Sequence, residues 1–192
     1  MNRKLYNQDL HIHTEFSYGD RAVIRGMNVE IISWLKHAKI IGISDHFEYL
    51  TGKRYEIYKN EVKKYGFYCG TEVDGYKESV KAKNYDFDYY IYHCFNKDKD
   101  YKGARLLINT GKPVIIAHPY ALGTDLNKVP EACYVEINNR YIWRSNWKKE
   151  LLPFINKFNF VLSSDAHQPN WLNQEISIQV CTELGIKECI IF

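Results

Sequence analysis

Short apolar runs typical of buried strands recur seven times along this chain, and this rhythm constrains the fold more than any other feature. The runs are rich in β-branched and aromatic residues, as strands buried on both faces usually are. They cover residues 9–13, 40–46, 67–73, 88–95, 113–119, 133–139 and 160–167. We therefore expect seven strands.

Stretches of helical period lie between most of these runs. Examples are residues 28–39, 101–111 and 145–158, with Ser145 as an expected N-cap and Gly111 as an expected C-terminal stop. Alternation of strand and helix is typical of parallel strands joined by crossover helices. The sequence therefore predicts an α/β fold, either an open doubly wound sheet or a barrel, built as one domain over residues 1–192.

Composition narrows the classes of partner. The chain has no run of 18 apolar residues and no apolar segment near its start, so we expect a cytoplasmic protein without a membrane partner. The net charge of +3 is mild and the lysines are scattered, which does not indicate a nucleic-acid partner. The five cysteines include no C-x-x-C pair, and we expect them to be reduced residues of the core.

The first apolar run carries two histidines. In "DLHIH" the side chains of His11 and His13 share one face, because strand side chains alternate with period two. An ordinary core would hold aliphatic residues there, and two buried imidazoles would each need a hydrogen-bond partner. A metal ion would supply that partner.

Polar residues occur at the C-terminal end of every apolar run. Six of the seven histidines follow this rule, and only His37 falls in a predicted helix, that of residues 28–39. Parallel α/β folds build their sites at this edge. The residues concerned are His11, His13, Asp45, His46, Glu72, Asp74, His93, His118, Glu136 to Asn139, Asp165 and His167.

Each motif alone has an ordinary explanation. A single histidine such as His93 is more often a hydrogen-bonded core or surface residue, "SDH" at 44–46 could cap a helix, and "AHP" at 117–119 could form a turn. Buried carboxylates such as Glu72 and Asp165 are costly without a partner. Together, six imidazoles and two carboxylates predict a site for Zn²⁺, Mn²⁺ or Fe²⁺.

Taken in order, these motifs resemble those of the PHP (polymerase and histidinol phosphatase) family, over nearly the whole chain. The resemblance rests on His11-x-His13-Thr14, Asp45-His46, "GTEVD" (70–74), His93, "IAHP" (116–119), "EINN" (136–139) and "SSDAH" (163–167). It implies a distorted seven-stranded (β/α) barrel, similar to a TIM barrel, with two or three divalent metal ions at its C-terminal face.

The resemblance also implies a ligand set for each metal. The first ion would be held by His11, His13, Glu72 and Asp165, and the second by Glu72, His93 and His118. The third would be held by His46, His167 and an acidic residue of the loop after the first strand, which we assign to Asp20.

Two further residues are expected to support the reaction. Arg140 directly follows "EINN", where a guanidinium could bind phosphate oxygens, with Arg144 and Arg21 as alternatives; a plain surface arginine is the competing interpretation. Asp45 is expected to orient an imidazole rather than to bind metal.

The predicted function is hydrolysis of a small phosphomonoester by a metal-activated hydroxide, with the small phosphorylated substrate as the main partner. Two alternatives stay open. One is a nuclease or nucleotide phosphatase acting on nucleic-acid ends, for which a basic groove would be the mark. The other is a non-catalytic, metal-stabilised accessory module, for which missing ligands would be the mark.

Overall fold

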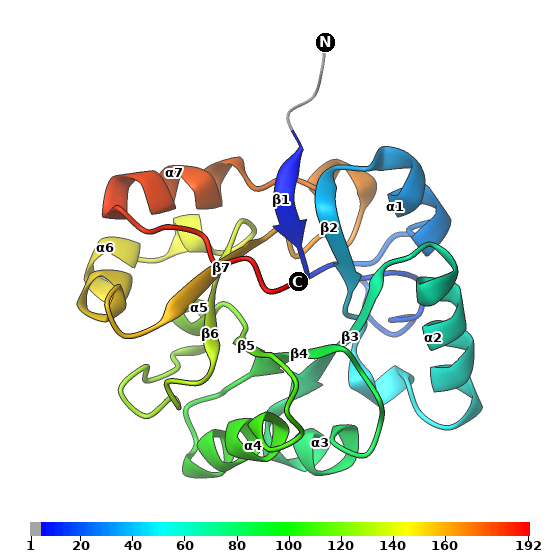
Figure 1. Cartoon of the computed structure of the whole chain (residues 1–192), viewed down its shortest axis with the longest axis horizontal. Helices are drawn as coiled ribbons and strands as arrows, with labels where there is room; N and C mark the ends of the chain where they lie inside the picture. The colour runs from blue at the N-terminus through cyan, green and yellow to red at the C-terminus, as the bar shows by residue number, and fades with distance from the viewer. Residues whose placement is uncertain (1–4) are drawn as a thin grey trace.

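A ring of seven parallel strands forms the centre of the protein (Figure 1). The computed structural model describes residues 5–192. Each strand pairs with its neighbour in chain order, from β1 through β7, and an isolated bridge between Ile12 and Ala166 joins the segments that follow β1 and β7. The predicted seven-stranded barrel is therefore confirmed and the open sheet is wrong. The strands are β1 (Tyr6–Asp9), β2 (Ala38–Ile43), β3 (Tyr68–Asp74), β4 (Tyr89–His93), β5 (Val114–Ile116), β6 (Tyr134–Asn138) and β7 (Asn159–Ser163).

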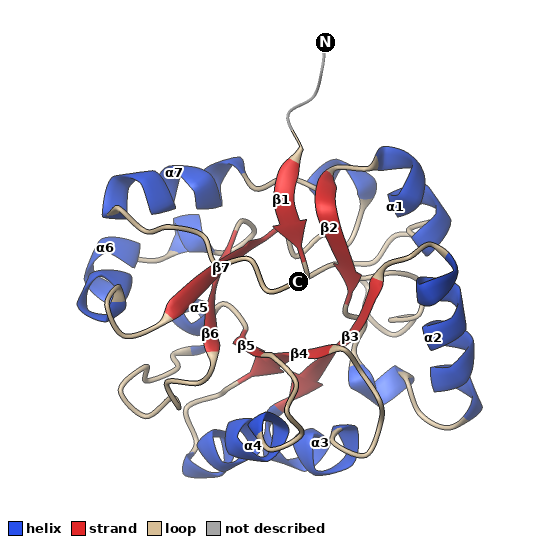
Figure 2. Ribbon diagram, in the orientation of Figure 1, coloured by secondary structure: helices blue, strands red, loops and turns tan. Residues whose placement is uncertain are grey.

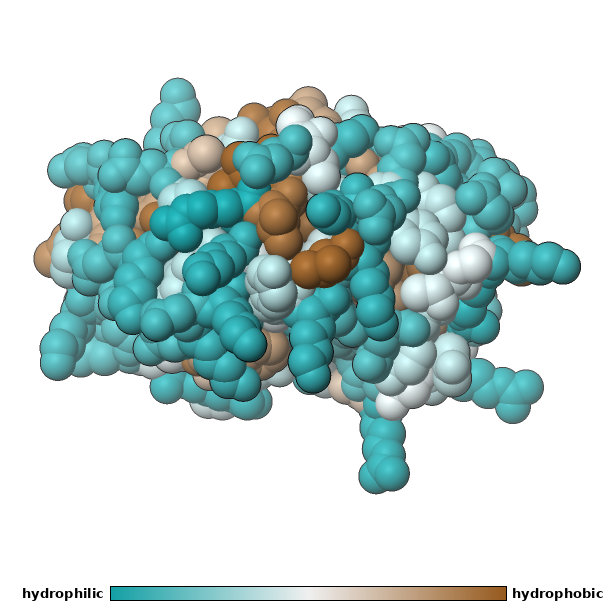
Figure 3. All heavy atoms as spheres, turned by 90° about the horizontal axis from the view of Figure 1, so that it is seen from below, coloured by the Kyte–Doolittle hydropathy of each residue, from teal (hydrophilic) through white to brown (hydrophobic). Residues whose placement is uncertain are grey.

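Helices surround the ring on its outer side (Figure 2). The α-helices are α1 (Val29–Leu35), α2 (Lys53–Lys64), α3 (Gly75–Ala82), α4 (Asp98–Ile108), α5 (Pro119–Leu122), α6 (Trp147–Leu151) and α7 (Glu175–Leu184). Short 3₁₀ turns are η1 (Phe47–Tyr49), η2 (Ile142–Arg144), η3 (Leu152–Phe154) and η4 (Pro169–Trp171). The face over α3 and α4 is mostly hydrophilic, with a few apolar side chains near its middle (Figure 3), as expected of an outer layer of helices.

Several predicted boundaries were wrong. The first strand spans residues 6–9 rather than 9–13, so His11 and His13 follow it in an extended segment. Helix α1 ends at Leu35 because Lys36 adopts a left-handed conformation (φ 42°), which places His37 outside the helix. The predicted helix 145–158 is capped by Asn146 instead of Ser145.

That last helix also continues as a 3₁₀ turn, η3, from Leu152. Pro153 has no N–H to offer to the preceding turn of an α-helix. By contrast, Gly111 lies in the left-handed region (φ 78°) just after α4, in the terminating position that the sequence predicts.

The barrel closes between β1 and β7 by a short seam. Ile12 pairs with Ala166 as an isolated parallel bridge, and the His13 N–H donates to the Ala166 carbonyl at 2.9 Å. The Asp9 carboxylate accepts the Ser164 N–H at 3.1 Å and also contacts His37 Nε2 at 2.9 Å. The seam brings the segments that carry His11, His13, Asp165 and His167 together.

The N-terminal end of the barrel is filled by apolar side chains. Phe192 stacks on Tyr68, with ring centroids 3.9 Å apart, and contacts Tyr89 edge-on. Gln8 holds this C-terminal segment by donating to the Cys189 carbonyl and accepting the Ile191 N–H. Figure 1 shows the end of the chain lying over the centre of the ring. The opposite, C-terminal end of the strands is therefore the one that can hold a site.

The cysteines and the helix lengths bear on two expectations from composition. The five cysteines are free thiols, four of them buried and Cys189 half-buried, which agrees with reduced residues of the core. Across residues 5–192 the helices are all too short or too polar to cross a bilayer.

Candidate metal centre

Glu72, near the C-terminal end of β3, is the centre of the predicted site. Its side chain is only 2% exposed. One carboxylate oxygen lies 3.2 Å from His11 Nε2 and the other lies 3.2 Å from His13 Nε2. The two Nε2 atoms are 3.1 Å apart. The period-two prediction that His11 and His13 share one face is therefore confirmed, although both residues lie beyond the strand.

A second pair of imidazoles meets the same carboxylate. His93, at the end of β4, places Nε2 2.5 Å from Glu72 Oε1. His118, which follows β5, has its Nε2 3.1 Å from His93 Nε2 and 4.0 Å from Glu72 Oε1. Glu72 thus lies between two groups of ligand atoms, as the family resemblance implies.

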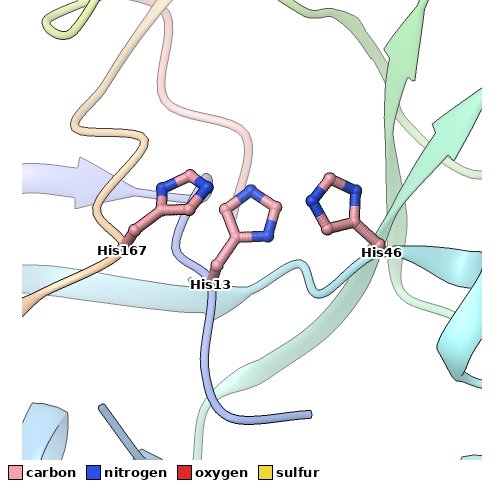
Figure 4. A group of neighbouring side chains, drawn as sticks. All are labelled: His13, His46 and His167. Carbon is pink, nitrogen blue, oxygen red and sulfur yellow. The ribbon is translucent and has the colours of Figure 1, made fainter. Parts of the chain in front are cut away.

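A third group gathers around His13. The rings of His46 and His167 lie on either side of it, with centroids 4.6 Å and 4.2 Å from that of His13 (Figure 4). The carboxylate of Asp20 lies 2.9 Å from His167 Nε2 and 3.3 Å from His46 Nε2. Asp20 is thus brought to the position expected of the loop acid, and His13 is an additional neighbour that the sequence did not predict for this group.

Asp165 lies between the groups. Its Oδ1 is 3.8 Å from the Nε2 atoms of both His11 and His13, and its Oδ2 is 4.0 Å from His118 Nε2. Asp165 has φ 53° and His118 has φ 22°, which are unusual values for residues with a Cβ atom. Strain of this kind persists where the surroundings fix it, and it is typical of functional sites.

Glu136, on β6, holds two of these histidines in place. It is fully buried, and its Oε1 accepts the His11 Nδ1–H at 2.6 Å and also a bond from the Ser163 hydroxyl. Its Oε2 accepts the His118 backbone N–H at 2.7 Å and the Asn138 amide at 3.1 Å. Glu136 fixes the tautomer of His11 so that Nε2 faces Glu72.

Asp74 fixes the tautomer of His93 in the same way, because His93 Nδ1 lies 2.5 Å from Asp74 Oδ1. Asp74 and Glu136 were predicted among the possible ligands at strand ends but were assigned to none of the three metals. The signal was present, because Glu72 with Asp74 and Glu136 with Asn138 are polar pairs at period two, and each pair must share one face.

Asp45 was predicted to orient an imidazole, and this prediction was wrong. Within the described chain its carboxylate is hydrogen-bonded by the Thr14 N–H and hydroxyl and by the Ser17 hydroxyl, each at 2.6 Å, and not by an imidazole. Ser17 Oγ in turn accepts the His46 N–H at 3.0 Å. Asp45 therefore fixes the loop that carries Asp20, because a buried carboxylate takes the nearest donors and the loop N–H and hydroxyl groups are closer than any ring.

Arg140 lies in the wall of a cavity of about 420 Å³ above the histidines. Its Nη1 is 3.4 Å from Asp165 Oδ1 and 3.1 Å from His167 Nδ1, and its guanidinium packs over the rings of Tyr141 and Trp171. The competing interpretation as a plain surface arginine does not fit this position. Neither Arg144 nor Arg21 lines the cavity.

The charges of the site act strongly on its imidazoles. Burial lowers the pKa of His93, but Glu72 and Asp74 outweigh this effect and raise it to about 10. Burial also opposes a charge on His46, while Glu72 and Asp20 raise its pKa to about 9. Buried carboxylates therefore attract positive charge to these rings, as they would attract a cation.

The donor set itself fits a cation. Two neutral imidazoles that face each other through Nε2 at 3.1 Å either oppose lone pairs or share one proton. Two nitrogens bound to one metal at about 2.1 Å would lie about 3.0–3.4 Å apart, which matches both contacts. Three groups bring their ligand atoms within 4.8 Å of one another: His13, His46 and His167; His11, His13 and Glu72; and Glu72, His93 and His118.

No protein-family model matches this sequence, and no curated protein matches it. Similar solved structures include a truncated 3-deoxy-D-arabino-heptulosonate 7-phosphate synthase and a phospho-2-dehydro-3-deoxyheptonate aldolase (DAHP synthase), both from Thermotoga maritima. Each superposes with a TM-score of 0.51 and 16% identity over 96% of this chain, which spans 75% of the first and 58% of the second. At this identity the likeness shows the barrel fold alone.

Proposed function

We propose that this protein is a metal-dependent phosphoesterase of the PHP type that hydrolyses a small phosphomonoester. The observation that carries the proposal is the position of Glu72, which two pairs of imidazoles approach within 2.5–4.0 Å. Divalent ions such as Zn²⁺, Mn²⁺ or Fe²⁺, two or three per chain, would neutralise a phosphoryl group and lower the pKa of water. Enzymes of the barrel fold place their sites at this end of the strands.

The chain's own residues would divide the remaining work. The Arg140 guanidinium faces the cavity and can donate two parallel hydrogen bonds to phosphoryl oxygens, which a lysine could not do as rigidly. Glu136 and Asp74 hold His11 and His93 with their Nε2 atoms directed at Glu72. Asp45 supports the site indirectly, through the loop that carries Asp20.

The cavity favours a small substrate over a polymer. Its volume of about 420 Å³ falls in the range of small-molecule sites. Arg140 is the single lysine or arginine among its lining residues in the described chain, whereas a nucleic-acid groove follows the backbone with several. Each predicted ligand lies within 3.2 Å of another predicted ligand, which disfavours a non-catalytic accessory module.

The direct test is to remove metal from the purified protein with a chelator and to assay phosphomonoesters, nucleotides and oligonucleotides before and after adding Mn²⁺ or Zn²⁺. We expect activity on phosphomonoesters that the chelator abolishes and the metal restores. Full activity in protein verified to be free of metal would refute the metal mechanism. Activity confined to oligonucleotides would favour the nuclease alternative.

A further inference from the structure

The wall of the cavity is different on its two sides. Over β7, β1, β2 and β3 the lining is made only of imidazoles and carboxylates. Over β4, β5 and β6 the lining holds the predicted ligands His93 and His118 and the Arg140 guanidinium, and beside them four further residues, Phe95, Ala121, Leu122 and Tyr141. These four residues, which we call the apolar wall, come from the β4–α4 loop, α5 and the segment after β6.

The apolar wall lies directly against the metal centre. The Phe95 ring packs edge-on to His93, with centroids 5.8 Å apart, and the Tyr141 ring lies 4.8 Å from that of His118. Phe95 is 38% exposed although it is a large hydrophobic residue. An apolar group bound there would cover this surface and remove it from water, while the adjoining part of the same molecule lay among the metal-ligating side chains.

The backbone fixes this wall in position. The Phe95 N–H donates to Asp100 Oδ2 at 3.2 Å, which ties the β4–α4 loop to the start of α4. Leu122 ends the short helix α5, and Gly123 stops that helix in a left-handed conformation (φ 67°). A wall that is already ordered loses little conformational entropy when a ligand binds.

The charges that lie next to the apolar wall limit the chemistry of the ligand further. The Asp74 side chain, at the end of β3, is 47% exposed, and its carboxylate contacts His93, against which Phe95 packs. The Arg140 guanidinium packs over the rings of Tyr141 and Trp171 and contacts Asp165. A second anionic group bound beside the apolar wall would therefore lie near the Asp74 carboxylate, and the two negative charges would repel each other.

We propose that the apolar wall is the subsite for the leaving group, and that the preferred substrates are phosphomonoesters of an aryl or branched alkyl alcohol that carries no second anionic group. This inference rests on the proposed function, because it takes the other end of the substrate to be a phosphoryl group beside Arg140. Phe95 and Leu122 would then determine specificity without taking part in the reaction.

The test uses phosphonates, which bind but cannot be hydrolysed at the P–C bond. Calorimetry on the Mn²⁺-loaded protein would compare phenylphosphonate, methylphosphonate and 2-carboxyethylphosphonate. We expect phenylphosphonate to bind about tenfold more tightly than methylphosphonate, since an apolar pocket typically discriminates to this degree. The carboxylated compound should bind no more tightly than methylphosphonate, because its second charge faces Asp74.

Variants separate the apolar wall from the metal centre. Phe95→Ala and Leu122→Ser should each reduce the preference for phenylphosphonate to within about twofold while methylphosphonate binding is kept. Leu152→Ser is the matched control, because Leu152 is 53% exposed and lies outside the cavity. Metal content and circular dichroism would be measured for each variant.

Three results would overturn the subsite: equal binding of the three phosphonates, tightest binding of the carboxylated one, or a preference that both variants keep. A phenylphosphonate preference in a protein that hydrolyses no phosphomonoester would refute the proposed function alone. Hydrolysis without that preference would refute the subsite alone.

Discussion

Replacing Glu136 by Gln changes one oxygen to an amide nitrogen at a position with four hydrogen-bond donors around it. On one side are the His118 N–H at 2.7 Å and the Asn138 NH₂ group at 3.1 Å, which donate and cannot accept a bond. On the other side are His11 Nδ1 at 2.6 Å and the Ser163 hydroxyl, which can. The orientation of the new amide decides the outcome.

Turning the new NH₂ group toward His118 and Asn138 would leave buried donors facing donors. Each such unsatisfied group costs about 1–3 kcal/mol, so this orientation would cost about 2–6 kcal/mol. Turning it toward His11 is cheaper, because the Ser163 hydroxyl can rotate and His11 Nδ1 can become an acceptor. The ring proton of His11 must then move to Nε2, the nitrogen that faces Glu72.

A histidine protonated at Nε2 cannot bind a metal through that atom. We therefore expect Glu136→Gln to weaken binding of the ion near His11 and His13 by about 10–100-fold, or about 1.4–2.7 kcal/mol, the usual effect of removing an orienting partner. The assay is titration of metal-free protein with Zn²⁺ against a chromophoric chelator, with elemental analysis of the saturated protein.

The matched control is Glu131→Gln, which makes the same chemical change on an exposed residue. It should keep the affinity of the wild-type protein. Circular dichroism separates loss of metal from loss of fold. An unchanged Zn²⁺ affinity in folded Glu136→Gln would refute the reasoning about the His11 tautomer.

Further predictions concern three other side chains. Glu72→Gln should release more metal than His118→Ala and abolish hydrolysis, because Glu72 faces both groups of imidazoles; equal metal loss by elemental analysis would count against a bridging role. Asp20→Ala should lower occupancy of the ion near His46 only, and unchanged stoichiometry and rate would show that Asp20 is not a ligand. Arg140→Ala should keep the metal content and lower kcat/KM by about 10²-fold or more, as loss of a charged phosphate contact does. An unchanged kcat/KM would remove Arg140 from the mechanism.

The fold was predictable because its signal repeats. Seven buried runs alternating with amphipathic stretches admit few topologies, and parallel strands with crossover helices are the usual solution. What the sequence left open was closure of the ring. That closure depends on single contacts across the β1–β7 seam, such as Asp9 with Ser164 and His13 with Ala166, and no periodicity encodes them.

Strand limits were less predictable than strand order. The apolar run at 9–13 continues past the last ladder pair of β1, because Leu10 packs inside the barrel and Ile12 in the outer core after regular pairing has ended. Burial and strand pairing thus have different limits here. The sequence pattern reports burial, and so it placed the histidines correctly on one face while it placed the strand too late.

The metal ligands were easier to predict than the carboxylates that orient them, Asp74 and Glu136. The reason is again that a sequence pattern gives the face on which a side chain lies but not its contacts. Glu72 and Asp74 share a face of β3, and the first reaches the centre of the imidazoles while the second stays at the rim, 47% exposed. On β6 the corresponding first residue, Glu136, lies deep and orients His11 instead of joining the ligand groups. Strands of a barrel are staggered along its axis, so equal positions on two strands lie at different depths. Sequence spacing fixes the face of a side chain, whereas the stagger decides whether it contacts the metal or supports a ligand.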